Sequence, residues 1–176
     1  MHDLRTPLAT VHGFARTIQR NVELEEPTSR YVEMIASAAV QMTELLEAIA
    51  LAARIESQRY EPTMVPTDTL AAAEEAAAKV AGVRAEGVGE TLPADHETLV
   101  RSLAGFALCA RRHGAAPEVT IAVDGPTFTL SPIGPAGPIL LGEELRDLGA
   151  AVAGRAIRAL GGSVEVAGNS LRVTLR

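Results

Sequence analysis

The first residues of the chain bring together side chains that can carry out nucleophilic chemistry. His2 is followed directly by Asp3, and Thr6 lies four residues after His2. An imidazole nitrogen is a nucleophile near neutral pH. Asp3 can accept the proton of the other ring nitrogen and so keep the lone pair of the attacking nitrogen free. In a helix Thr6 lies one turn away on the same face, where its hydroxyl can bond the imidazole or position a water, so these three are the candidate catalytic residues.

The stretch from His2 to Leu8, HDLRTPL, resembles the phosphoacceptor box of sensor histidine kinases. In that family the histidine is followed by an acid, then by Thr or Asn and Pro at fixed spacing. The resemblance implies that His2 carries a phosphoryl group, because a phosphoramidate is reactive enough to pass phosphate on to a carboxylate. It also implies a response-regulator receiver domain as the partner, and a role for Thr6 in dephosphorylation of that partner.

The surface that contacts the regulator is expected just below His2 on the same helix. Ala9, Gly13 and Arg16 lie there, and small side chains allow a partner helix to approach. Arg5 can counter the charge of the phosphate. The alternatives are that the small residues serve packing within a dimer, and that Arg5 is an ordinary solvated arginine.

Two helices are predicted to position His2. From His2 to about Asn21 apolar residues recur at spacings of three and four, which is typical of one helix face. After a break at residues 23–27, Thr28 or Ser29 can cap a second helix that runs to about Ser57. The second helix carries a heptad seam, which consists of Val32, Ile35, Ala39, Met42, Leu46, Ile49 and Ala53.

The length of this seam predicts a homodimer. At roughly 1.5 Å per residue the second helix spans about 40 Å, and a single shorter partner cannot cover it. Two hairpins can complete a four-helix bundle. The alternative is that Leu45, Leu51 and Ile55 pack against the second half of the same chain.

The second half is predicted to be a small α/β sandwich, which makes the whole chain α plus α+β. Pro62 and Pro66 push the residues before them out of the helical region, so an extended linker and a domain boundary are expected, with domains at 1–61 and 62–176. Helices packed on a small mixed or antiparallel sheet are expected beyond the boundary. The helices are placed near residues 68–81, 95–112 and 143–160, and the two β-hairpins at residues 119–130 and 163–175.

This half resembles the ATP-binding domain of the same kinases, but the nucleotide-binding residues are missing. In the family two asparagines hold magnesium and phosphates; Gly105 and Cys109 occupy their places, and neither is a hard oxygen ligand. The aspartate that reads adenine falls at Pro132. Only about five residues separate Gly137 from Glu143, where the family has a mobile lid. The resemblance therefore implies a degenerate ATP-binding domain and no cofactor of the chain's own.

An intact phosphoacceptor beside an eroded nucleotide site predicts a histidine phosphotransferase. Such dimeric proteins look like kinase cores but only relay phosphate between response-regulator aspartates, here through His2, and the partner regulator supplies the magnesium. Three alternatives are left open. The chain can be the C-terminal core of a sensor histidine kinase whose sensor lies outside it, a non-catalytic dimeric scaffold that binds a regulator, or an ATP-dependent kinase.

Composition excludes other classes of function. The formal net charge is -6 and Lys79 is the only lysine, so a surface that neutralises nucleic-acid phosphates is not expected. Cys109 is the only cysteine, which rules out an internal disulfide. Without a signal peptide or a long apolar run, we expect no membrane span and a cytoplasmic location.

Overall fold

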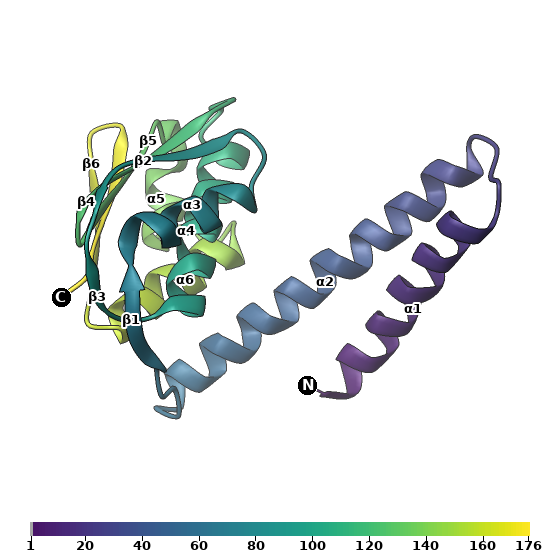
Figure 1. Cartoon of the computed structure of the whole chain (residues 1–176), viewed down its shortest axis with the longest axis horizontal. Helices are drawn as coiled ribbons and strands as arrows, with labels where there is room; N and C mark the ends of the chain where they lie inside the picture. The colour runs from purple at the N-terminus through teal and green to yellow at the C-terminus, as the bar shows by residue number, and fades with distance from the viewer. Residues whose placement is uncertain (1) are drawn as a thin grey trace. The chain divides into compact units, whose positions relative to one another are not determined.

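The computed structural model describes residues 2–176, with side chains from Leu4 onwards. Met1 and the side chains of His2 and Asp3 are outside the described part. The chain divides into two compact units, one up to Ala50 and one from Leu51 to Arg176, and each is described by itself (Figure 1). This division follows packing. The predicted boundary between residues 61 and 62 divides the chain by function and stays a prediction.

The first unit is a helical hairpin. Helix α1 spans His2–Asn21 and α2 spans Thr28–Glu56, close to the two predicted helices. Small side chains make the contact between them, since Ala15, Val32 and Ala36 form a buried cluster. Side chains of this size let the two helices approach closely.

The predicted heptad seam is divided between two faces of α2. Ala39 is fully buried, whereas Ile35, Met42 and Ile49 are 45–49% exposed. Helix α1 also exposes a large apolar side chain, because Phe14 is 67% exposed. Apolar faces of this extent mark interaction sites, and they support the expected pairing of two hairpins. The alternative holds only in part, because the chain buries Leu51 in the second unit and leaves Leu45 exposed.

Helix α2 is also apolar enough to meet the criteria for a membrane span. It contains an 18-residue window with a mean hydropathy of 1.4. The expectation that the chain contains no membrane span stays a prediction. Length and composition do not distinguish a membrane span from a helix whose apolar residues pack against other helices.

The second unit is built on a five-stranded sheet with the order β2-β4-β5-β7-β6. Strand β2 runs parallel to β4, and the other neighbours are antiparallel. Both predicted hairpins are present, as β4–β5 and β6–β7. The five strands span Val83–Gly89 (β2), Val119–Gly125 (β4), Thr127–Ser131 (β5), Ser163–Ala167 (β6) and Ser170–Thr174 (β7).

A separate two-stranded ribbon pairs β1 (Met64–Asp68) with β3 (Thr91–Asp95). The sequence pattern predicted a linker for the first of these segments and no strand for the second. Pro66 lies directly opposite Pro93 in the ribbon. Because proline has no N–H to donate, both segments lack the usual sequence pattern of a strand.

Three long helices cover one face of the sheet (Figure 1). Each begins after an aspartate, Asp68, Asp95 or Asp147, whose carboxylate accepts a hydrogen bond from the amide three residues further on. The cap at Asp147 explains why the predicted helix at 143–160 starts later than expected. The helices span Thr69–Ala78 (α3), His96–His113 (α4) and Leu148–Ala159 (α6), with a 3-10 turn at Gly134–Ala136 and a short α5 at Gly137–Leu141.

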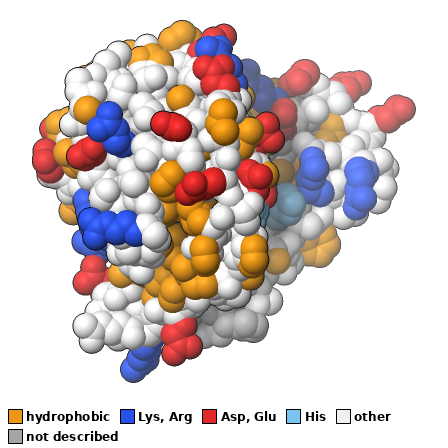
Figure 2. All heavy atoms as spheres, turned by 60° about the vertical axis from the view of Figure 1, so that its left-hand side comes forward, with side chains coloured by type: hydrophobic (Ala, Val, Ile, Leu, Met, Phe, Trp, Pro, Cys, Tyr) orange, Lys and Arg blue, Asp and Glu red, His pale blue; other side chains and the backbone are white. Residues whose placement is uncertain are grey.

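The core lies between these helices and the sheet. Its largest fully buried side chains include Phe106 and Leu103 of α4 and Phe128 of β5. On the face seen in Figure 2, basic side chains are interspersed with acidic ones. The lysine of the chain, Lys79, pairs with Glu75 at 2.9 Å. Basic side chains that pair with acidic neighbours are less available to bind phosphate groups. The expectation that nucleic acid is not a partner stays a prediction.

Replacing Ile49 by Glu should prevent self-association of the hairpin. The wild-type chain is expected to be a dimer at micromolar concentration by light scattering. The variant should be monomeric, because an unpaired charge buried in the helix interface costs several kcal/mol. Helix content by circular dichroism should stay unchanged, since Ile49 is 46% exposed within its own chain.

Gln41→Glu is the matched control, because it adds the same charge at an exposed polar position of α2. This variant should remain a dimer. A monomeric wild-type chain would contradict the prediction.

Candidate functional site

The predicted phosphoacceptor segment forms the first turns of α1. The proposed roles of His2 and Asp3 depend on side chains outside the described residues, and they stay predictions. Thr6 is exposed, and its carbonyl accepts a hydrogen bond from Thr10 Oγ1 at 3.0 Å. The backbone therefore places Thr6 one turn after His2 on a solvent-accessible part of the helix.

The residues expected to contact a regulator form one exposed stripe on α1. Arg5, Ala9, Gly13 and Arg16 are all exposed, and their spacings of four, four and three place them on the same face. A Cβ built at Gly13 would meet nothing within 4 Å. These residues are therefore not used for packing inside the hairpin. Their contact with a regulator stays a prediction.

Helix α6 packs directly on the part of α4 that would face a nucleotide. A Cβ added at Gly105 would lie 3.4 Å from the carbonyl oxygen of Gly149 and 3.7 Å from Cβ of Ala153. One turn later Cys109 is fully buried. Burial and the nearby carboxylate of Asp147 raise the pKa of the Cys109 thiol to about 12, so the thiol is neutral. Neither position presents an oxygen ligand.

The segment aligned with the adenine-reading aspartate is held by a residue of the second predicted hairpin, at residues 163–175. Asn169, between β6 and β7, accepts hydrogen bonds through Oδ1 from the amides of Ile133 at 3.2 Å and Gly134 at 2.7 Å. These amides follow Pro132 and are occupied within the protein. They are therefore not available to bind a phosphate or a base.

The short segment in place of a lid is closed by its own hydrogen bonds. The amide of Gly142 donates to the carbonyl of Ile139 at 3.0 Å, and the amides of Glu143 and Glu144 donate to the carbonyl of Pro138 at 2.9 and 3.2 Å. Binding of a phosphate by backbone amides requires free N–H groups. In this segment these three amides are already used.

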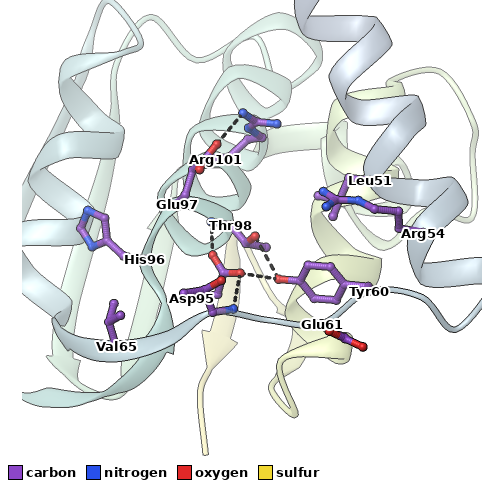
Figure 3. Close-up of a pocket in the computed structure, with 11 residues that line it drawn as sticks. Leu51, Arg54, Tyr60, Glu61, Val65, Asp95, His96, Glu97, Thr98 and Arg101 are labelled. Atoms are coloured by element: carbon purple, nitrogen blue, oxygen red, sulfur yellow. Dashed lines mark hydrogen bonds and ion pairs between the residues drawn. The ribbon is translucent and has the colours of Figure 1, made fainter. Parts of the chain in front are cut away.

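A cavity of about 400 Å³ lies beside the start of α4, and sequence reasoning missed it (Figure 3). Its central residue is Tyr60, whose hydroxyl donates to Asp95 Oδ2 at 3.0 Å and lies 3.0 Å from Thr98 Oγ1. The amide of Thr63 also donates to Asp95 Oδ2, at 3.1 Å. The guanidinium of Arg54 lies 5.9 Å from the centre of the Tyr60 ring. This network fastens the chain after α2 to the N-terminus of α4.

Burial and hydrogen bonding shift the pKa values of Tyr60 and Asp95. Burial is the largest cause that raises the pKa of Tyr60, to about 12, and the Asp95 carboxylate adds to the rise. Burial also raises the pKa of Asp95, but the hydrogen bonds from the amides of Thr98 and Thr63 and from Tyr60 outweigh it, and the pKa falls below its ordinary value. The carboxylate form of Asp95 is therefore stabilised in the folded protein.

Replacing Asp95 by Asn should remove a pH-dependent part of the stability while keeping the helix cap. Because the pKa of Asp95 is lower in the folded than in the unfolded chain, its contribution is complete above about pH 4 and is lost as the pH falls further. At pH 7 the free energy of unfolding should drop by about 1.5–3 kcal/mol, as for hydrogen bonds to a charged group.

Urea denaturation between pH 3 and pH 7 measures this difference. Asp68→Asn at the exposed cap of α3 is the matched control and should show a smaller effect at every pH. If the difference between wild type and Asp95→Asn does not shrink toward pH 3, the role assigned to the carboxylate is wrong.

Comparison with known proteins agrees with this architecture. Residues 1–58 match the family model described as His Kinase A (phospho-acceptor) domain. Full-length ShkA in complex with AMPPNP has a similar fold, with a TM-score of 0.69 and 23% identity over 98% of this chain and 43% of that chain. This chain thus spans less than half the length of ShkA. A search of curated proteins gives no match.

Two further structures share the fold. The histidine kinase AdeS of Acinetobacter baumannii has a TM-score of 0.62 and 20% identity over 99% of this chain and 97% of that chain. The ATP-binding domain of PrrB from Mycobacterium tuberculosis has a TM-score of 0.51 and 18% identity over 65% of this chain and 96% of that chain. The helical hairpin and the α/β sandwich that the sequence predicts are therefore confirmed.

These findings overturn the main functional prediction. A histidine phosphotransferase that relays phosphate between regulator aspartates is wrong, because the phosphoacceptor family match and the kinase structures favour the stated alternative. The prediction took the loss of nucleotide ligands as a change of class, although ligand side chains can change while the fold stays. Residues 1–58 match the model of the phosphoacceptor domain, and the fold of the chain is similar to the folds of solved histidine kinase structures.

Proposed function

We propose that the chain acts on a response-regulator receiver domain through His2, as the core of a sensor histidine kinase. The observation that carries this proposal is the phosphoacceptor match over residues 1–58, with His2 at the start of α1. In the transfer step the phosphorylated regulator is the donor, and a nitrogen of the His2 imidazole attacks the phosphorus in line. The bond between phosphorus and the carboxylate oxygen of the regulator breaks, and the carboxylate is the leaving group.

The residues around His2 have separate roles in this proposal. Asp3 holds the second ring nitrogen, and Thr6 positions the water that hydrolyses the regulator's phosphate. The exposed stripe of Arg5, Ala9, Gly13 and Arg16 faces the regulator, which brings its own magnesium. The support for this surface is the exposure of its four residues on a single face of α1.

The chain works as a dimer in this proposal. A second hairpin covers the exposed side chains of Ile35, Met42 and Ile49. A four-helix bundle of this kind accounts for the apolar composition of α2 without a membrane.

The second unit keeps the kinase fold but does not use ATP. Three features of the described residues support this part of the proposal. Helix α6 packs against Gly105, Cys109 is buried, and the amides of Ile133 and Gly134 bond to Asn169. The activities left to the chain are those of the phosphoacceptor hairpin toward its regulator.

Calorimetric titration with ATP and magnesium should give no saturable binding at micromolar concentrations. Incubation with γ-labelled ATP should leave the chain unlabelled, because the positions of the magnesium ligands carry Gly105 and Cys109. An ATP-competent sensor kinase core serves as the positive control in both assays. Micromolar binding, or γ-phosphate found on His2, would refute the claim that the second unit is inactive.

His2→Ala should abolish acid-labile, base-stable phosphate on the chain after incubation with a phosphorylated receiver domain. The dimer should persist, since residue 2 lies outside the apolar seam. Asp3→Asn should slow transfer by about 10²- to 10⁴-fold, as expected for loss of an orienting base. Thr6→Ala should chiefly slow hydrolysis of the regulator's phosphate. The measurements are the phosphate on each protein and its position by mass spectrometry.

His12→Ala is the matched control, because His12 lies on the same helix without the flanking pattern. It should transfer at the wild-type rate. Phosphate on His12, His96 or His113 would show that the site assignment is wrong. A regulator that binds the dimer without any transfer would favour the scaffold alternative.

A further inference from the structure

Three potential metal ligands converge between the end of α4 and the start of α6. One ligand atom each from Cys109, His113 and Asp147 lie within 4.8 Å of one another. Cys109 and His113 are four residues apart and so share one face of α4. Asp147 is the residue that caps α6. We propose that these three side chains bind a divalent cation of the zinc type.

The distance between His113 and Asp147 fits two ligands of a tetrahedral metal ion better than a direct hydrogen bond between the two side chains. His113 Nε2 lies 3.5 Å from Asp147 Oδ2. A charge-assisted hydrogen bond is shorter, about 2.7–2.9 Å. Ligand atoms at about 2.0–2.3 Å from tetrahedral zinc are separated from each other by about 3.3–3.6 Å. The remaining separations are at most 4.8 Å, so binding would require the side chains to rotate toward the ion.

The carboxylate of Asp147 is already oriented for this role. Its Oδ1 accepts a hydrogen bond from the amide of Ala150 at 3.0 Å, which leaves Oδ2 directed toward His113. A bond of this kind to the second oxygen fixes a metal ligand in place. Gly149 leaves the room that the carboxylate needs, because a Cβ there would lie 3.2 Å from Oδ1.

Charge and exposure also fit a bound cation. Binding of the ion requires the neutral Cys109 thiol to release its proton to solvent. The resulting thiolate and the Asp147 carboxylate balance a divalent ion, so the occupied site is neutral and tolerates the burial of Cys109. The side chains of Asp147 and His113 are 10% and 30% exposed, which leaves a path from solvent and a fourth position for water. Arg112, whose charge acts on the Cys109 thiol, is exposed to solvent, and Arg111 lies beside the backbone of Gly82.

The ligand types select zinc over magnesium. Thiolate and imidazole are ligands that zinc and its analogue cobalt accept, whereas magnesium requires hard oxygen ligands. The site uses Cys109, one of the two positions at which the kinase family carries a magnesium ligand. A zinc-type ion here would join the last turns of α4 to the start of α6.

Titration of the metal-free full chain with Co²⁺ tests this proposal. We expect one ion per chain, an absorption band from charge transfer between thiolate and cobalt, and visible bands of tetrahedral cobalt. Addition of Zn²⁺ should remove these bands. Cys109→Ala should abolish the charge-transfer band and weaken Zn²⁺ binding by at least about 100-fold, since even loss of an outer-shell partner costs 10- to 100-fold.

Asp147→Asn provides a second variant that keeps the helix cap and removes the ligand charge. It should weaken Zn²⁺ binding even if Cys109→Ala fails to fold. His96→Ala is the control, because His96 lies outside the proposed site and its Nε2 pairs with Glu75 Oε2 at a distance of 2.9 Å. This variant should bind Zn²⁺ with the affinity of the wild-type chain.

Absence of the charge-transfer band at saturating Co²⁺ would overturn the proposal and leave a buried thiol beside a histidine and an aspartate. Unchanged Zn²⁺ affinity in both site variants would place the ion elsewhere and overturn it as well. None of these measurements involves phosphate transfer, so their outcome is independent of the proposed function.

Discussion

The close packing of α6 on α4 is the contact on which the second unit depends. A Cβ added at Gly105 of α4 would lie 3.4 Å from the carbonyl oxygen of Gly149 of α6, which is ordinary van der Waals contact. The same contact brings the cap at Asp147 next to the last turns of α4. Since α6 leads directly into β6, this contact also fixes the edge of the sheet. A nucleotide between these helices would have to separate them.

The sequence predicted the helices and hairpins that are determined by neighbouring residues in the chain. Asp124-Gly125 and Gly168-Asn169 mark the two hairpins, and periodicity marks α1 and α2. Strand β2 was missed because its partner β4 is distant in sequence and its own residues include two glycines. The ribbon of β1 and β3 was missed because prolines occupy facing positions. Pairing between distant segments leaves no period in either one.

The sequence could predict only part of the candidate site, for a similar reason. The phosphoacceptor box could be identified from seven consecutive residues, since their order is itself the signal. Tyr60, Thr63 and Asp95 gave no such signal, because their contact exists only after the chain has folded back onto the start of α4. The wrong prediction of a histidine phosphotransferase was based on Gly105 and Cys109. The identities of these two residues predict which ligand the fold can hold, but other residues determine the fold itself.

The attachment of α2 to the second unit determines where this protein can be divided or recombined. Leu51 is buried in that unit, Tyr60 bonds to Asp95, and Arg155 of α6 pairs with Glu56. A fragment that begins at Pro62 would lose all three contacts and expose the residues that line the cavity beside α4. The apparent linker is thus part of a folded module. Exchange of whole domains between such proteins, in the laboratory or in evolution, would have to cut within the long helix, before Leu51.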